Sequence, residues 1–367
     1  MIPLDDLLTV LENGPKAQRP RISDRPSARG FFRPAFVLFT SGSTGQPKGV
    51  LLEHAGIVNM AMHCSRALGC GPADVHLQAA TVSFDAMLGE FMVPLVLGGC
   101  MAILPPGAQL DPQAVVRCMS QHAVTTTVCV PSVMQAWLQA GLTESLCPCF
   151  RLAIVGGEVM TPTLINCMLA ALPEATLINI YGPTEASLFV TQQGFSAREE
   201  LHALPSSGRC PISPPPDPAP LIPIGCPISN VNIHILDQQQ RPVPVRVAGE
   251  ICISGVCLAH GYLNQDELTR SSFVANPICA SGCHSRMYRT GDLGRWQHDG
   301  TLEILGRFDR QVMLHFSMAF ACGKALLVNT TATSACLNTA TQVPGATSAT
   351  YSNGLYQRAD SHSINAP

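Results

Sequence analysis

The stretch Phe36–Val50, FVLFTSGSTGQPKGV, carries the strongest indication of the fold. Its apolar run Phe36–Phe39 predicts a buried strand, and the small residues that follow predict a loop. Glycines let a backbone approach a phosphate closely, while hydroxyls and N–H groups donate to its oxygens. Lys48 adds a compact cation, but Pro47 and Gly49 beside it break the spacing of the common P-loop. We therefore expect a different phosphate-binding loop, with a flexible Ser/Gly linker as the alternative.

Five further motifs follow this stretch along the chain. They are Phe84–Ala86 (FDA), Asn179–Glu185 (NIYGPTE), Gly249–Gly255 (GEICISG) running on to Gly261-Tyr262, Tyr288–Leu293 (YRTGDL) and Gly306–Val312 (GRFDRQV). With the loop, they resemble the adenylate-forming, or AMP-binding, enzymes. That superfamily includes acyl-CoA synthetases, luciferases and the adenylation domains of nonribosomal peptide synthetases. The resemblance extends over residues 34–312, and the shared order of the motifs argues against a chance match.

The fold class follows from the spacing of apolar segments. Short apolar strands are predicted at Thr126–Val130, Leu152–Val155 and Thr176–Ile180, and helical stretches such as Pro162–Leu172 alternate with them. Thr161 before Pro162 is a typical helix start. This alternation predicts an α/β fold with a mostly parallel sheet.

The second half of the chain has a different pattern. Short strands are predicted at Val231–Leu236, Gly249–Ser254 and Leu302–Ile304, with turns between them, which indicates a small β-barrel or meander. The resemblance implies the same order, namely parallel-sheet α/β subdomains followed by a small distorted β-barrel.

The domain organisation is expected to be incomplete relative to the family. We predict an irregular N-terminal segment at 1–33 and a partial adenylation domain at 34–312. Within that domain, 34–200 would form the α/β part and 220–312 the barrel part and hinge. Residues 313–367 match nothing in the family and predict a disordered tail. The family's C-terminal lid domain and its catalytic lysine have no counterpart there, so we expect a chain truncated at both ends and impaired in activity.

Composition excludes several classes of protein. The chain has 367 residues, of which 46% are hydrophobic and 13% charged, and this balance argues against disorder. A net charge of −3 offers no footprint for nucleic acid. The longest apolar stretch, Phe91–Leu104, is interrupted by Pro94 and two glycines, so no membrane span is expected. The sixteen cysteines include no C-x-x-C pair, which favours buried thiols in a reducing cytoplasm over a zinc site.

The resemblance implies a reaction in which a carboxylate attacks the α-phosphate of ATP and pyrophosphate leaves. Charge then develops on phosphate oxygens, so donors and cations are needed. Lys48, Thr184 and Glu185 would be catalytic: Lys48 on the β- and γ-phosphates, Thr184 on the α-phosphate and Glu185 on Mg²⁺. A helix cap is the alternative for Thr184-Glu185. The other phosphate-binding residues would be Thr40, Ser41, Gly42, Ser43, Thr44 and Gly45.

The nucleoside is assigned to later motifs by the same resemblance. Tyr181 would stack on adenine and Asn179 would bond to its edge, while Asp292 and Arg307 would contact the ribose. A lone Gly-Asp is usually a turn, but the preceding Tyr-Arg-Thr favours the functional interpretation. Gly156, Gly157 and Glu158 would pack beside the base, and Gly182 is a further expected nucleotide-binding residue.

Asp85 indicates the class of carboxylate substrate. In amino-acid-activating members an Asp at this position pairs with the α-ammonium group, and an unpaired carboxylate beside an apolar pocket would be costly. A capping or solvent-facing Asp is the alternative. An apolar or aromatic substrate side chain is expected from the other assigned pocket residues, although such residues are core by default. They are Ala86, Gly89, Cys129, Ala153, Val155, Ile180, Leu188 and Phe189.

Together these features predict ATP-dependent activation of an amino acid as its aminoacyl-adenylate within nonribosomal peptide synthesis. ATP and Mg²⁺ are the expected cofactors. Phosphopantetheine would sit on a carrier domain that is not present in this chain, and the expected partners are the carrier and condensation domains of a larger synthetase. The alternatives are a fragment of an acyl-CoA or aryl-acid ligase and a catalytically inactive nucleotide-binding remnant.

Overall fold

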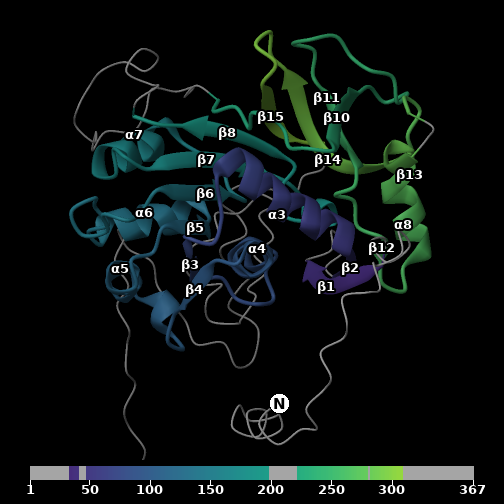
Figure 1. Cartoon of the computed structure of the whole chain (residues 1–367). Coiled ribbons are helices and arrows are strands. Elements are labelled where there is room, and N and C mark those ends of the chain that lie inside the picture. The colour runs from purple at the N-terminus through teal and green to yellow at the C-terminus, as the bar shows by residue number, and fades with distance from the viewer. Residues whose placement is uncertain (1–32, 41–46, 198–220, 280–281, 309–367) are drawn as a thin grey trace, which may run out of the picture. The chain divides into compact units, whose positions relative to one another are not determined.

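Seven strands form the central sheet of the α/β part in the computed structural model, which describes residues 33–40, 47–197, 221–279 and 282–308 (Figure 1). The strand order is β4-β3-β5-β6-β7-β8-β9, parallel from β4 to β7 and antiparallel from there to β9. The mostly parallel sheet predicted from the sequence is therefore confirmed. The strands are β3 (Val75–Gln78), β4 (Cys100–Ile103), β5 (Thr126–Cys129), β6 (Leu152–Gly156), β7 (Thr176–Tyr181), β8 (Thr191–Phe195) and β9 (Cys226–Pro227).

Helices cover both faces of this sheet (Figure 1). Side chains of α5, α6 and α7 pack in one apolar cluster, and those of α3 and α4 pack in another with the opposite face. Strands β5 and β6 are buried along their whole length for this reason. The helices are α3 (His54–Leu68), α4 (Val93–Leu97), α5 (Pro112–Gln121), α6 (Pro131–Gln139) and α7 (Pro162–Ala171).

Local capping sets two of these helix starts. The Thr161 hydroxyl accepts from the Leu164 N–H at 3.2 Å, and the Asp111 carboxylate accepts from the Gln113 N–H at 2.9 Å. Both helices have proline in the first turn, where a missing N–H costs nothing. The helix predicted to begin at Pro162 is confirmed by this geometry.

A second sheet of five antiparallel strands makes up the β part. Strand β14 is eleven residues long and pairs with three strands: with β11, with β13 through its first residues, and with β15 through its last. This curled sheet confirms the β part that the sequence predicts. Its elements are β10 (Val231–Leu236), β11 (Gly249–Gly255), β13 (Phe273–Ala275), β14 (Arg286–Trp296) and β15 (Leu302–Arg307), with α8 (Asp266–Ser272) beside them.

A third sheet corrects one expectation. The apolar run Phe36–Phe39 does form a strand, β1 (Pro34–Thr40), but this strand pairs antiparallel with β2 (Lys48–Glu53). Strand β12 (Gly261–Tyr262) pairs with β2 on its other side. Phe39 is 62% exposed, so the prediction of a buried strand was wrong. Leu38 is buried while Val37 and Phe39 on either side of it are exposed, so only one face of this strand is covered.

Several expectations concern parts outside the described residues. The phosphate loop at 41–46, the segment 1–32, the proline-rich 198–220 and the tail from 309 onward belong to these parts. All described residues lie within one compact unit, Met1–Gly323. Within them no helix is long and apolar enough to cross a membrane, and no disulfide joins the cysteines.

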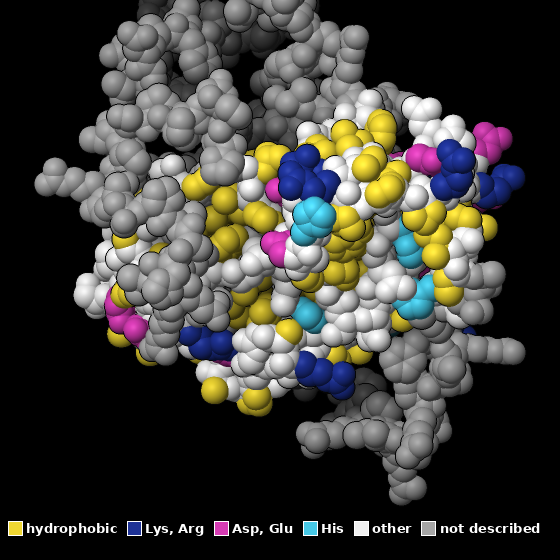
Figure 2. All heavy atoms as spheres, turned by 90° about the horizontal axis from the view of Figure 1, so that it is seen from above, with side chains coloured by type: hydrophobic (Ala, Val, Ile, Leu, Met, Phe, Trp, Pro, Cys, Tyr) yellow, Lys and Arg dark blue, Asp and Glu magenta, His cyan; other side chains and the backbone are white. Residues whose placement is uncertain are grey.

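Figure 2 shows how charge is distributed over one face of the molecule. Lys and Arg side chains appear singly or near acidic ones, with hydrophobic side chains between them, and no broad basic surface forms on this face. Such a surface is what a nucleic-acid backbone would require.

Replacing Leu177 with alanine tests the core of the central sheet. Leu177 is 0% exposed in β7, so Leu177→Ala should reduce the free energy of unfolding by about 2–5 kcal/mol, measured by urea denaturation. Leu95, at 55% exposed in α4, is the matched control, and Leu95→Ala should change it by less than about 0.5 kcal/mol. Equal effects of the two substitutions would contradict this packing.

Candidate functional site

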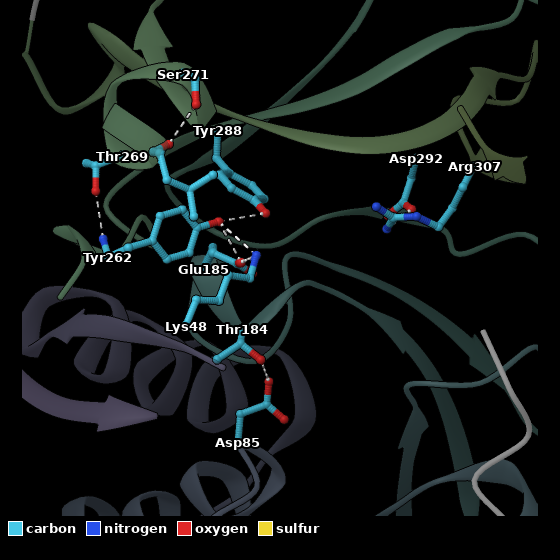
Figure 3. A network of polar contacts seen from close by, with 11 residues as sticks. Lys48, Asp85, Thr184, Glu185, Tyr262, Thr269, Ser271, Tyr288, Asp292 and Arg307 are labelled. Carbon is cyan, nitrogen blue, oxygen red and sulfur yellow. Dashed lines mark hydrogen bonds and ion pairs between the residues drawn. The ribbon is translucent and has the colours of Figure 1, made fainter. Parts of the chain in front are cut away.

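The candidate site begins with a buried ion pair between two sheets (Figure 3). Lys48, the first residue of β2, places its Nζ 2.7 Å from Oε1 of Glu185. Glu185 lies in the short 3₁₀ turn η3 (Thr184–Ala186) that follows β7. The Tyr262 hydroxyl of β12 donates to the same Oε1 at 2.8 Å and accepts from Lys48 Nζ at 3.1 Å. Residues far apart in the sequence thus meet at one oxygen atom.

Because both side chains are largely buried, Lys48 and Glu185 each need the other to stay charged. Glu185 is only 4% exposed, and burial alone would raise its pKa, but the Lys48 ammonium outweighs this and holds the pKa below its ordinary value. Burial likewise lowers the pKa of Lys48, and attraction to Glu185 outweighs it, so the pKa is raised. Both groups are therefore charged near neutral pH, and removing one would leave the other uncompensated.

Thr184 connects the ion pair to Asp85. Its hydroxyl donates to Oδ2 of Asp85 at 2.5 Å, while the neighbouring Glu185 binds Lys48 (Figure 3). Asp85 precedes the π-helical turn η1 (Leu88–Met92) that follows β3 along the chain. Burial raises the pKa of the Asp85 carboxyl to about 6; the Thr184 hydroxyl opposes this, and Glu185 adds to it. No cation among the described residues is paired with Asp85 by a salt bridge.

A second polar group joins β7 to the β part. Tyr181 donates to Oδ2 of Asp292 at 2.5 Å, and Nη1 of Arg307 lies 2.8 Å from Oδ1. Asp292 and Arg307 are register partners on β14 and β15, which places them directly opposite each other. The Thr290 hydroxyl accepts from the Asp292 N–H at 2.9 Å. Tyr181, which the sequence assigned to the base, and Arg307, assigned to the ribose, are thus both bound to Asp292.

The other residues assigned to the base make contacts within the protein. Glu158 accepts from the N–H and hydroxyl of Ser132, at 3.0 and 2.9 Å, at the start of α6. Asn179 donates through Nδ2 to the Pro223 carbonyl at 2.9 Å. Gly157 has φ +83°, a conformation that favours glycine.

Close packing explains the glycine of the YGPTE motif. A Cβ on Gly182 would lie 2.4 Å from Cα of Phe189, so no other residue fits without moving the backbone. The turn that carries Thr184 and Glu185 is therefore held tightly against the chain that follows it.

Thr40 ends β1 at the point where the predicted phosphate loop begins. Its Oγ1 is buried and has no hydrogen-bond partner in the described part of the chain. The hydroxyls of Thr126, Thr127 and Thr191 are buried without a partner in the same way, so the position of Thr40 beside the predicted phosphate loop is what fits it to ligand binding. The loop residues Ser41, Gly42, Ser43, Thr44 and Gly45 lie outside the described residues.

The residues assigned to the substrate pocket fall on two faces of the central sheet, and this corrects the prediction. One set shares a core cluster with Val128 and Ile154, and Gly89 packs against Val128 and Leu188. The set on this face is Ala86, Gly89, Ile180, Leu188 and Phe189.

The remaining assigned residues pack on the other face, with α5, α6 and α7. Successive side chains of a strand point to opposite faces, so a shift of one residue moves a side chain out of the pocket. Val128 and Ile154 are the neighbours that share the face of Ala86. The residues that this excludes from the pocket are Cys129, Ala153 and Val155.

Sequence reasoning did not assign a role to Tyr262 and Tyr288. Both belong to motifs that are visible in the sequence, and their hydroxyls lie 3.4 Å apart beside Glu185. The signal was available as Gly261-Tyr262 and Tyr288–Leu293, but only the pairing of β12 with β2 shows where the side chains meet.

One group of metal-ligand types occurs elsewhere in the described part of the chain. Cys70, Asp74 and His76 lie together, but Arg151 binds both oxygens of Asp74, at 2.9 and 2.6 Å. A guanidinium already supplies the positive charge there, so we interpret this group as a structural ion pair.

The fold is shared with solved nonribosomal peptide synthetase structures. A family model described as AMP-binding enzyme matches residues 6–263, and the chain belongs to this family.

The chain is similar to part of several much longer proteins. Indigoidine synthase of Dickeya dadantii (strain 3937) is 38% identical over 283 residues, or 76% of this chain and 18% of that protein. Tyrocidine synthase 3 of Brevibacillus parabrevis is 39% identical over 279 residues, or 76% of this chain and 4% of that protein. The chain therefore spans less than a fifth of the length of either relative.

Among solved structures, the nonribosomal peptide synthetase FmoA3 is similar with a TM-score of 0.65 and 30% identity, covering 76% of this chain and 28% of that one. FmoA3 has also been solved with AMPPNP bound and with alpha-methyl-L-serine-AMP bound.

Replacing Thr184 tests the contact that links the two carboxylates. Thr184→Val removes the hydroxyl that donates to Asp85, so the pKa of Asp85 should rise above its value of about 6. Carboxyl ¹³C chemical shifts followed against pH would measure this. Thr143→Val, in an exposed loop, is the control that should leave the titration unchanged. An unaltered Asp85 titration in Thr184→Val would mean that the contact does not form in solution.

Proposed function

We propose that this chain forms the nucleotide and amino-acid pocket of an adenylation domain, in which an amino acid is activated by ATP as its aminoacyl-adenylate. The observation that carries the proposal is the pair of neighbours Thr184 and Glu185. Thr184 binds Asp85, the proposed ammonium ligand, and Glu185 binds Lys48, the proposed phosphate ligand. The reacting carboxylate and the α-phosphate would meet between these two contacts.

Nucleotide binding is supported by donors and cations close to the motif residues. Lys48 would hold the β- and γ-phosphates, Thr184 the α-phosphate, and Asp292 with Arg307 the ribose. The unpartnered hydroxyl of Thr40 would donate to a phosphate oxygen. The further proposed contacts are Ser41, Gly42, Ser43, Thr44, Gly45, Gly157, Glu158, Asn179, Tyr181 and Gly182.

Glu185 fits a divalent cation. Its buried Oε1 already binds an ammonium group and a hydroxyl, so the surroundings favour positive charge at that atom. Mg²⁺ prefers carboxylate oxygen and would supply charge neutralisation at the phosphates. Lys48 and Thr184 would orient the phosphates, and Tyr262 would orient the Glu185 carboxylate.

Asp85 supports an amino acid over a fatty or aryl acid. Its side chain is half-buried, has no ion-pair partner in the described part of the chain, and would gain one from an α-ammonium group. The apolar lining next to it would receive an apolar or aromatic side chain. That lining is Ala86, Gly89, Val128, Ile154, Ile180, Leu188 and Phe189.

The partners would be the carrier and condensation domains of a larger synthetase. This proposal is supported by the similar solved structures, which include the nonribosomal peptide synthetase FmoA3 and a protein of that class with adenylation and PCP domains. A carrier domain would present phosphopantetheine, to which the activated amino acid is transferred.

A matched pair of ligands tests the proposed substrate class. In the presence of AMPPNP, leucine or phenylalanine should bind at least about tenfold more tightly than the same acid without its amine, because a charged pair in a buried pocket is worth more than 1.4 kcal/mol. Isothermal titration calorimetry would measure both affinities. Asp85→Asn should abolish the preference and leave AMPPNP binding intact. Equal affinity for the acids without the amine would instead favour the aryl- or acyl-acid ligase.

The same interaction predicts a pH dependence. Below pH 6 the Asp85 carboxyl is protonated and cannot pair with an ammonium group, since its pKa is raised to about 6. The affinity for the amino acid should therefore rise from pH 5 to pH 7.5 and then level off. Asp85→Asn should show weak binding that does not change over this range. A flat profile for the unaltered protein would show that Asp85 does not bind the ammonium group.

A further inference from the structure

Tyr262 occupies the centre of the contacts around Glu185 (Figure 3). Its hydroxyl donates to Glu185 Oε1 at 2.8 Å, accepts from Lys48 Nζ at 3.1 Å, and lies 3.4 Å from the Tyr288 hydroxyl. A phenol has one proton to donate and a small number of lone pairs to accept with, so these contacts use its hydrogen-bonding capacity. Its ring also lies under the Lys48 ammonium, with 4.6 Å between Nζ and the ring centroid.

The position of Tyr262 is set by its surroundings. Its side chain is 3% exposed, and its N–H donates to the Thr269 hydroxyl at 2.9 Å. The ring packs edge-on against that of Phe273, with 5.7 Å between the ring centroids. The centroids of the Phe273 and Tyr288 rings are 4.9 Å apart. A hydroxyl held in this way can fix the distance between two charged groups without moving itself.

Lys48 and a divalent cation would compete for the charge of one carboxylate. Glu185 binds Lys48 and Tyr262 through Oε1, and the proposed function places Mg²⁺ on the same carboxylate. Lys48 is in turn the proposed ligand of the β- and γ-phosphates, so it cannot stay on Glu185 and serve them without a change in the pair. A buried carboxylate without any cation would be costly, which explains why the ammonium group is there in the chain without ligand.

We propose that Tyr262 is a positioning residue that holds Lys48 on Glu185 as an internal counter-ion, and that the metal-bound nucleotide replaces this ion pair by exchanging partners. The nucleotide phosphates draw Lys48 away from Glu185, and the metal ion takes its place on the carboxylate. This inference rests on the proposed nucleotide and metal roles of Lys48 and Glu185.

The exchange couples two binding events. Metal alone must displace an ammonium group that has no ion-pair partner other than Glu185 among the described residues, so the affinity for metal is low. Once phosphates are present, Lys48 has a new partner, and metal binding no longer leaves it unpaired. Metal and nucleotide should therefore each raise the affinity for the other by the same factor, as linkage requires.

Titration with Mn²⁺ tests the exchange, because Mn²⁺ suits the same oxygen ligands as Mg²⁺ and its free ion is counted by electron paramagnetic resonance. AMPPNP should raise the Mn²⁺ affinity of the unaltered chain by about tenfold or more. Lys48→Met, which removes the competing charge at similar volume, should bind Mn²⁺ alone at least about fivefold more tightly and lose most of the coupling. Tyr262→Phe should likewise raise the affinity for Mn²⁺ alone and reduce its coupling to AMPPNP, each by a smaller factor than Lys48→Met.

The matched control is Arg117→Met, which removes one positive charge from an exposed pair on α5 and should leave Mn²⁺ affinity within twofold. Thermal unfolding gives an independent readout. In a metal chelator Lys48→Met should have a lower Tm than the unaltered chain, and Mn²⁺ without nucleotide should restore it. The same Mn²⁺ should leave the Tm of the unaltered chain nearly unchanged.

The outcomes separate the exchange from the proposed function. If Lys48→Met and the unaltered chain bind Mn²⁺ alone equally well, while AMPPNP and Mn²⁺ bind together, the counter-ion exchange is wrong and the proposed function stands. If AMPPNP binds but Mn²⁺ never does, Glu185 is not a metal ligand and the exchange falls with that role. If AMPPNP does not bind at all, the proposed function itself is overturned.

Discussion

The carboxylate of Glu185 is almost entirely out of water, and a buried carboxylate keeps its charge only when a cation lies beside it. Lys48 supplies that cation from a different sheet, and Tyr262 fixes both groups from a third strand. The pairing of β12 with β2 brings the β part back onto the first sheet of the chain, where this contact forms. The elements β2, η3 and β12 therefore meet where the buried carboxylate of Glu185 needs the Lys48 ammonium group as its counter-ion.

Two carboxylates lie on either side of Thr184, and their environments give them opposite behaviour. Glu185 has a cation within 2.7 Å, and its pKa is lowered despite burial. Within the described part of the chain, the Thr184 hydroxyl is the side-chain donor to Asp85, and burial raises the pKa of Asp85 to about 6. Under the proposed function the first group is prepared for a metal ion, and the second gains its positive partner only when an amino acid arrives. Environments that separate the pKa values of neighbouring acids in this way are typical of active sites.

The central sheet determines which apolar residues can face Asp85. Its strands are buried on both faces, so hydrophobicity alone does not distinguish the pocket side from the helix side. The clusters divide the residues of β5 and β6 by strict alternation, with Val128 and Ile154 on one face and Ala153 and Val155 on the other. Selectivity for the substrate side chain would thus depend on which alternate residues of β5 and β6 face Asp85.

The sequence by itself determined the family motifs, the parallel sheet, the curled β part and the chemical types of the site residues, because these depend on local patterns of glycine, charge and hydrophobic spacing. It placed the helix at Pro162 and the strand at Val231–Leu236 correctly. It did not predict that Phe39 is exposed, that Cys129 faces away from Asp85, or that Tyr262 binds Lys48 and Glu185. Those facts depend on which strands pair and which face each side chain takes, and contacts between distant segments leave no periodic trace in one sequence. Only the tertiary structure brings residues 48, 185 and 262 to a single oxygen atom, since burial there makes each charge require the other.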